Sequence, residues 1–75
     1  MKLSELDKEQ TGIITLMSDT ILSRMLDLGV LVGDHLKVEQ NLFSGEYFLV
    51  STPDIRIGLT KQEADGVIVE LVNLK

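Results

Sequence analysis

SDTILSRMLDLGVLVG, the stretch from Ser18 to Gly33, decides the fold because it predicts a single amphipathic helix among short strands. Ser18 or Asp19 can cap the first turn with a side-chain oxygen, and Gly29 can end the helix because glycine adopts left-handed backbone angles without steric cost. Between these ends, apolar residues recur at helical spacing on one stripe: Ile21, Leu22, Met25, Leu26 and Leu28. We therefore expect a helix over about residues 19–28 whose apolar stripe packs on a sheet.

The rest of the chain is dominated by short β-type segments rich in branched and aromatic residues. We predict five strands, over residues 12–17, 35–41, 46–51, 55–59 and 67–72. The first reads as apolar on both faces, whereas the second alternates, with Leu36 and Val38 directed inward. In the third, Phe48 and Val50 are the expected core residues. Gly45 and Pro53 mark the turns before and after it.

Two further short elements complete the predicted architecture. Thr60 and Glu63 match the capping box of a helix start, which predicts a helical turn over about residues 61–65. Near the beginning of the chain, Ser4 could cap one turn that places Leu3 and Leu6 over the open end of a barrel. We expect a mainly β fold, a small and partly open barrel of five strands with one inserted helix.

Composition limits the classes of function. The 75 residues predict a single domain over residues 1–75, and the absence of cysteine excludes disulfides and thiolate chemistry. The formal net charge is −5 and the seven basic residues are scattered, so a nucleic acid partner is not expected. Apolar runs are too short to span a membrane, and no signal peptide pattern opens the chain. We expect a cytoplasmic protein.

Catalytic, cofactor and metal sites are not predicted. His35, the one histidine, has Lys37 beside it on the expected strand face, and Glu39 would lie about 13 Å away, too far to share an ion. Asp19 and Asp27 would stand about 12 Å apart at opposite ends of the helix, too far for an acid and base pair. No serine has an arranged base. We predict that the protein is not an enzyme.

Two candidate surfaces for binding a protein partner remain. The first is the outer helix face and the loop after it, with Arg24, Leu28, Val30 and Leu31 as contact residues. The second is the hairpin of the aromatic residues, with Phe43 and Tyr47 as contacts. An alternative is that Leu28 and Leu31 close the barrel mouth. Exposed strand edges also leave a homo-oligomer open as an alternative.

Over nearly its whole length, the sequence resembles the FeoA family, small cytoplasmic proteins associated with the bacterial ferrous iron transporter FeoB. The resemblance is carried by the order and spacing of these motifs: Leu-Ser-Glu-Leu at residues 3–6, Gly12, Arg-Met-Leu-Asp-Leu-Gly at 24–29, Gly-Asp at 33–34, Gly45, Ile-Gly-Leu at 57–59, Glu-Ala at 63–64 and Val-Ile-Val at 67–69. The helix followed by Leu-Gly and then by Gly-Asp is the most specific part.

This resemblance implies an SH3-like barrel and a regulatory role in ferrous iron uptake, through binding to the cytoplasmic region of FeoB. A similar domain occurs at the C-terminus of iron-dependent repressors. The resemblance therefore also implies an alternative, a regulatory domain that senses ferrous ion by weak binding.

Overall fold

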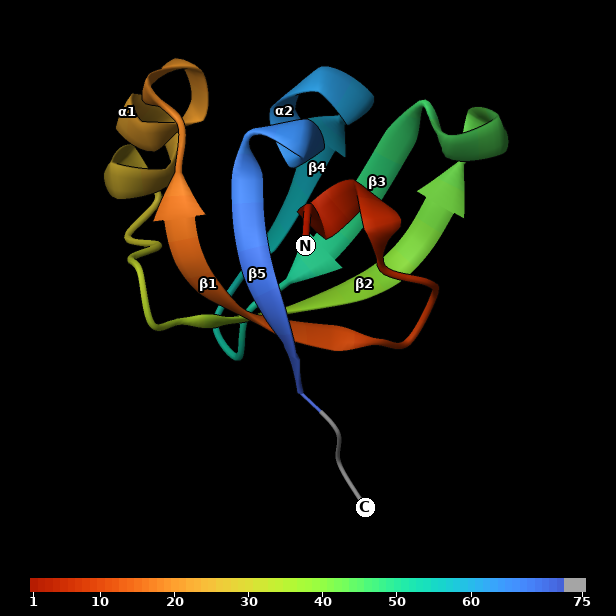
Figure 1. The fold of residues 1–75 in the computed structure, drawn as a ribbon, viewed down its shortest axis with the longest axis horizontal. Helices are drawn as coiled ribbons and strands as arrows, with labels where there is room; N and C mark the ends of the chain where they lie inside the picture. Colours follow the sequence, from red (N-terminus) through yellow and green to blue (C-terminus); the bar gives the residue numbers. More distant parts are fainter. Residues whose placement is uncertain (73–75) are drawn as a thin grey trace.

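Five antiparallel strands form one curved sheet with the order β4-β3-β2-β1-β5 (Figure 1). The computed structural model of the chain describes residues 1–72. The strands are β1 (Thr11–Met17), β2 (His35–Leu42), β3 (Tyr47–Ser51), β4 (Arg56–Thr60) and β5 (Val67–Val72). All five predicted strands are confirmed, with ends that differ by one residue at most, because alternating branched and apolar residues mark them.

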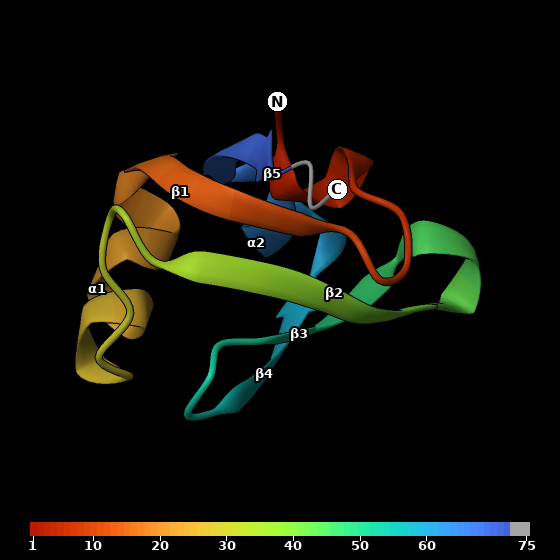
Figure 2. The same ribbon diagram turned by 90° about the horizontal axis from the view of Figure 1, so that it is seen from below.

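The helical elements stand outside the sheet, and two of them match their predicted bounds closely (Figure 2). They are α1 (Asp19–Asp27), α2 (Lys61–Asp65) and two short 3-10 turns, η1 (Leu3–Glu5) and η2 (Phe43–Gly45). Thr60 caps α2 as predicted: its hydroxyl oxygen accepts from the Glu63 N–H (3.2 Å), and the Glu63 carboxylate accepts from the Thr60 N–H (3.0 Å).

The helix α1 buries a narrower stripe than its sequence predicts. Ile21 and Met25 are buried and Leu22 is partly buried, but Leu26 and Leu28 are exposed. The helix lies at one side of the barrel (Figure 1), so only the line of residues that faces the barrel is covered. The prediction of a side-chain cap is also wrong, because the Ser18 hydroxyl bonds to that of Thr20 (2.9 Å) instead.

The sequence predicts that both faces of β1 are apolar and buried, and this prediction is wrong for the second half of the strand. Thr15 and Leu16 are exposed, and the pairing with β5 shifts register between Ile14 and Leu16. A β-bulge of this kind turns side chains toward the other face of the strand. Inward positions are as predicted in the other strands, with Leu36, Val38, Phe48 and Val50 all buried.

One end of the barrel is closed by the first six residues, as predicted. Leu3 and Leu6 are 0% and 1% exposed. The Ser4 hydroxyl does not cap η1 but donates to the Asp65 carboxylate of α2, and the Val69 N–H donates to the Met1 carbonyl (2.7 Å). The N-terminal segment is therefore fixed to both α2 and β5. No helix within residues 1–72 is long and apolar enough to cross a membrane.

Candidate functional site

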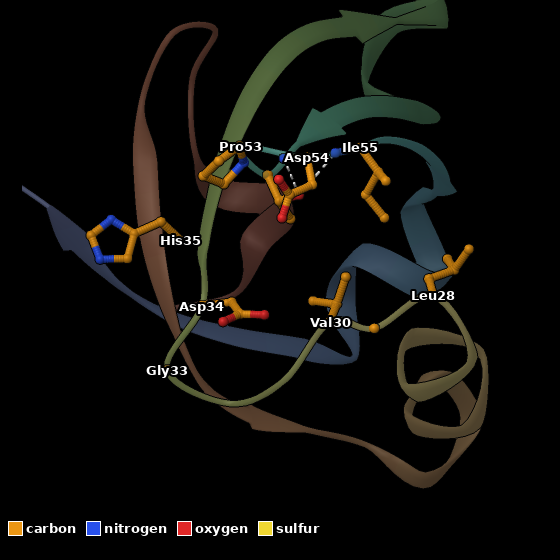
Figure 3. Close-up of a pocket in the computed structure, with 10 residues that line it drawn as sticks. Leu28, Val30, Gly33, Asp34, His35, Pro53, Asp54 and Ile55 are labelled. Carbon is orange, nitrogen blue, oxygen red and sulfur yellow. Dashed lines mark hydrogen bonds between the residues drawn. The ribbon is translucent and has the colours of Figure 1, made fainter.

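A cleft with a volume of about 300 Å³ opens between the loop that follows α1 and the turn that joins β3 to β4 (Figure 3). One wall comes from residues 28–35 and the other from residues 52–55, which are adjacent only in the folded protein. The lining residues are Leu28, Gly29, Val30, Gly33, Asp34, His35, Thr52, Pro53, Asp54 and Ile55. The cleft combines apolar side chains with two carboxylates.

The first wall takes its shape from two glycines. Gly29 (φ +80°) ends α1 and turns the chain back, so that the Val30 N–H donates to the Met25 carbonyl (2.8 Å). Gly33 (φ +98°) then allows a tight turn, in which the Asp34 carboxylate accepts from the Leu31 N–H (2.9 Å). These bonds fix the loop while its leucine side chains stay outside.

The second wall is a turn held by one hydroxyl group. The Thr52 side-chain oxygen accepts from the N–H groups of Asp54 (3.2 Å) and Ile55 (3.1 Å), and the Thr52 N–H donates to the Ile55 carbonyl (2.9 Å). Pro53 has a fixed φ and no N–H to satisfy, which suits this position. The turn therefore holds Ile55 partly buried against the core and leaves Pro53 and Asp54 exposed.

The structure brings only some of the predicted contact residues to the cleft. Leu28 is 42% exposed at its rim, and Leu31 is 53% exposed on the same loop. The alternative interpretation, in which both leucines close the barrel mouth, is therefore wrong, because neither side chain is buried. Val30 is 1% exposed, so its side chain belongs to the core and cannot reach a partner. Its burial fixes the loop between the two exposed leucines.

Arg24 has an internal role that its place in the sequence does not reveal. Its guanidinium donates to the Glu63 carboxylate (2.7 Å) and to the Gly58 carbonyl (3.0 Å), and so links α1 to α2 and to β4. Partial burial opposes ionisation of Glu63 most strongly, but the hydrogen bonds from Thr60 and Arg24 together outweigh it, and the pKa of Glu63 is lowered. About half of the Arg24 side chain is nevertheless exposed.

The aromatic hairpin lies away from the cleft and forms a separate surface. Phe43 is 77% exposed on η2, where its φ of +55° is unusual for a bulky residue. Tyr47 is half-buried, because its ring covers the bare Cα of Gly58 on the neighbouring strand. Of the two residues, only Phe43 projects into solvent.

Metal-ligating groups do not converge in the part of the chain that the structure describes. No group of three His, Asp or Glu side chains within residues 1–72 could hold an ion. His35 is exposed at the rim of the cleft, as predicted for a strand residue in contact with water.

The second wall of the cleft was not part of either predicted surface. The Thr52-Pro53-Asp54 turn is evident in the sequence, but no local signal pairs it with a loop about twenty residues earlier. Val32, which is exposed beside Leu31, was also missed. Its place in a short loop between Gly29 and Gly33 could have indicated an exposed position.

Comparisons with known proteins agree on one family. The FeoA domain profile matches residues 1–71. No curated protein matches the chain at a significant level.

Solved structures of FeoA proteins have the same fold. The solution structure of the FeoA protein from Chlorobium tepidum is 28% identical, with a TM-score of 0.87 over 97% of this chain and 71% of that one. The FeoA of Stenotrophomonas maltophilia, solved with zinc, is 28% identical, with a TM-score of 0.78 over 93% and 89% of the two chains. It is described as a prokaryotic SH3 domain protein and a candidate activating factor of ferrous iron transport.

A manganese-dependent transcriptional repressor shares the fold, with a TM-score of 0.85 and 17% identity over 96% of this chain and 41% of the repressor. The SH3-like architecture predicted from the sequence is confirmed. With its profile match over nearly the whole length, the chain belongs to the FeoA family, which is linked to ferrous iron transport.

Proposed function

We propose that the protein regulates bacterial ferrous iron uptake by binding the cytoplasmic region of the transporter FeoB, and that it has no enzymatic activity. The observation that carries this proposal is the exposure of Leu28, Leu31 and Val32 on one fixed loop beside the cleft. Exposed apolar side chains grouped around a hollow are typical of protein contact sites. Membership of the FeoA family supplies the transport context.

The loop supports binding because its backbone is already ordered. Its N–H groups are bonded within the loop, to α1 and to β1: Val30 to the Met25 carbonyl, Leu31 to the Asp34 carboxylate and Gly33 to the Ile14 carbonyl (2.8 Å). Binding a partner would therefore cost little conformational entropy in this segment, and more of the free energy of the contacts would contribute to affinity. Such a protein changes transport only by the difference between its affinities for two states of the transporter.

The test is a titration of the isotopically labelled protein with the cytoplasmic GTP-binding domain of FeoB, followed by backbone amide NMR. We expect saturable shifts clustered at residues 28–34. Leu31→Ser should weaken the binding at least about tenfold, because an apolar anchor is lost. Leu16→Ser is the matched control: Leu16 on β1 is exposed to a similar extent (61% against 53% for Leu31) but does not line the cleft, so its loss should leave the affinity unchanged.

Other outcomes would overturn the proposal in defined ways. Shifts confined to residues 43–47 would move the contact to the aromatic hairpin. Shifts with ferrous ion alone, under anaerobic conditions, would favour the ion-sensing alternative. Equal losses from Leu31→Ser and Leu16→Ser would show that the cleft loop has no special part in binding.

A further inference from the structure

The two walls of the cleft each contribute one carboxylate to the lining, Asp34 from the loop after α1 and Asp54 from the β3–β4 turn (Figure 3). The lining contains no lysine or arginine; the nearest basic residue along the chain, Arg56, borders the shallow hollow on the other side of the turn. Two like charges facing one hollow in a protein of net charge −5 create a negative local potential. This potential favours cationic groups in the cleft over acidic ones.

Both carboxylates retain the capacity to bind a further donor. Asp34 accepts the Leu31 N–H with one oxygen, Oδ2 (2.9 Å), while a carboxylate has two oxygens with about four acceptor sites. Asp54 takes part in its turn through its backbone N–H, which donates to Thr52, and not through its side chain. A donor group from outside can therefore bond to either carboxylate without breaking the fold of the wall.

The apolar part of the lining excludes a bare metal ion as the preferred occupant. Val30 forms the buried floor, Ile55 is partly buried beside it, and Leu28 stands at the rim. Hydrated ions gain nothing from such a surface, and within residues 1–72 no three acidic or histidine side chains are grouped so that they could hold an ion. An occupant that uses the whole lining needs both an aliphatic portion and a positive charge.

We infer that the cleft binds a polypeptide segment in which a lysine or arginine stands next to an aliphatic side chain. The aliphatic side chain packs on Leu28 and Ile55 above the buried Val30, and the cationic group lies between Asp34 and Asp54. This inference names the chemistry of the partner segment and rests on the proposed function only in placing that segment on the transporter. The size of the cleft, about 300 Å³, suits one or two side chains and not a folded domain.

The test uses a capped pentapeptide probe, acetyl-Gly-Leu-Lys-Leu-Gly-amide, with a second peptide that has glutamate in place of lysine. Each is titrated into the labelled protein in low salt and in about 0.5 M salt. We expect millimolar binding of the lysine peptide only, with shifts at the Leu31 amide, whose acceptor is Asp34, and weaker binding in high salt.

Asp54→Asn is the decisive variant because the Asp54 side chain does not hold its turn. It should weaken the lysine peptide about three- to fivefold, the loss expected for one exposed charge contact. Glu70→Gln is the matched control, because it removes an exposed charge from β5. It should leave the affinity for the lysine peptide unchanged. Asp34→Asn is less suitable alone, because it also alters the bond to Leu31.

The inference is overturned if the glutamate peptide binds as well as the lysine peptide, if neither shifts the cleft amides, or if Asp54→Asn and Glu70→Gln have equal effects. These failures are separate from failure of the proposed function. Binding of the lysine peptide without binding of FeoB overturns only the choice of transporter. Binding of FeoB at residues 28–34 without a preference for lysine overturns only the chemistry inferred for the segment.

Discussion

Two pairs of leucines with the same spacing have opposite environments in this protein. Leu3 and Leu6 are three residues apart and buried, whereas Leu28 and Leu31 are three residues apart and about half exposed. Leu3 begins η1 and Leu6 follows it, and this segment packs on α2 and β5, which cover both side chains. The second pair is directed away from the core by Gly29 and by the burial of Val30 between them.

This contrast shows that a leucine pair does not identify a core or a contact surface by itself. A leucine pair is buried only where a distant part of the chain packs directly on its side chains. At the closed end α2 and β5 cover the leucines, which contribute to stability, while at the cleft residues 52–55 stand across a hollow and leave Leu28 accessible to a partner. The two ends can therefore be altered separately, and the following experiments measure how far that separation holds.

The largest expected effect is on the closed end. Leu6→Ala should lower the free energy of unfolding by about 2–4 kcal/mol, because it leaves a cavity in a core that cannot collapse fully. Leu31→Ala, the matched change at the cleft, should cost less than about 0.5 kcal/mol. Urea unfolding followed by circular dichroism measures both. Similar losses for the two variants would contradict the division into a stabilising end and a binding end.

Glycines at the two ends should respond to alanine for different reasons. At Gly12, an added Cβ would lie 2.7 Å from the Val69 Cβ, so Gly12→Ala should cost about 1–3 kcal/mol by overpacking. At Gly33 the space is open, but φ is +98°, so Gly33→Ala should cost about 1 kcal/mol through backbone strain.

Second variants separate these two causes. Val69→Ala should rescue only part of the Gly12→Ala loss, because it removes the Cγ2 methyl group that would lie 2.8 Å from the new Cβ but keeps the Val69 Cβ. Gly33→Asn should cost less than Gly33→Ala, because asparagine tolerates positive φ better than alanine does. Equal losses from Gly33→Asn and Gly33→Ala would show that backbone strain does not limit the cleft loop.

The smallest effect is a pH dependence at the closed end. The Ser4 hydroxyl, and then Lys61, hold the pKa of Asp65 below its ordinary value of 3.8 in the folded protein. The ionised carboxylate therefore stabilises the fold above about pH 4, and this contribution is lost as pH falls through the lowered pKa. Asp65→Asn and Ser4→Ala should each reduce the loss of stability between about pH 5 and pH 3. An unchanged slope in either variant would exclude the Ser4 and Asp65 contact as an acid-sensitive link.

Features that depend on near neighbours could be predicted from the sequence. The end of α1 at Gly29 follows from one residue type, and the start of α2 follows from Thr60 and Glu63, three residues apart. Strand positions follow from alternation, which is why Phe48 and Val50 were placed correctly in the core.

Features that depend on distant neighbours could not be predicted. Arg24 and Glu63 are 39 residues apart and Ser4 and Asp65 are 61 apart, so no periodic pattern connects either pair. The cleft has the same origin, since Asp54 and Leu28 come together only through the curvature of the sheet. Leu28 and Leu31 are exposed as a contact surface requires, and their role in binding stays a prediction. The sequence did not indicate the opposite wall or its charge.

The contact of Arg24 with β4 has a consequence for the solubility of the folded protein. β4 is an outermost strand of the sheet, and such a strand offers unpaired backbone groups to which another chain can add. Here the Gly58 carbonyl is occupied by the Arg24 guanidinium, and the Thr60 N–H two residues later by the Glu63 carboxylate. Another chain would have to displace both side chains before it could extend the sheet. We therefore expect these two contacts to oppose aggregation through this strand.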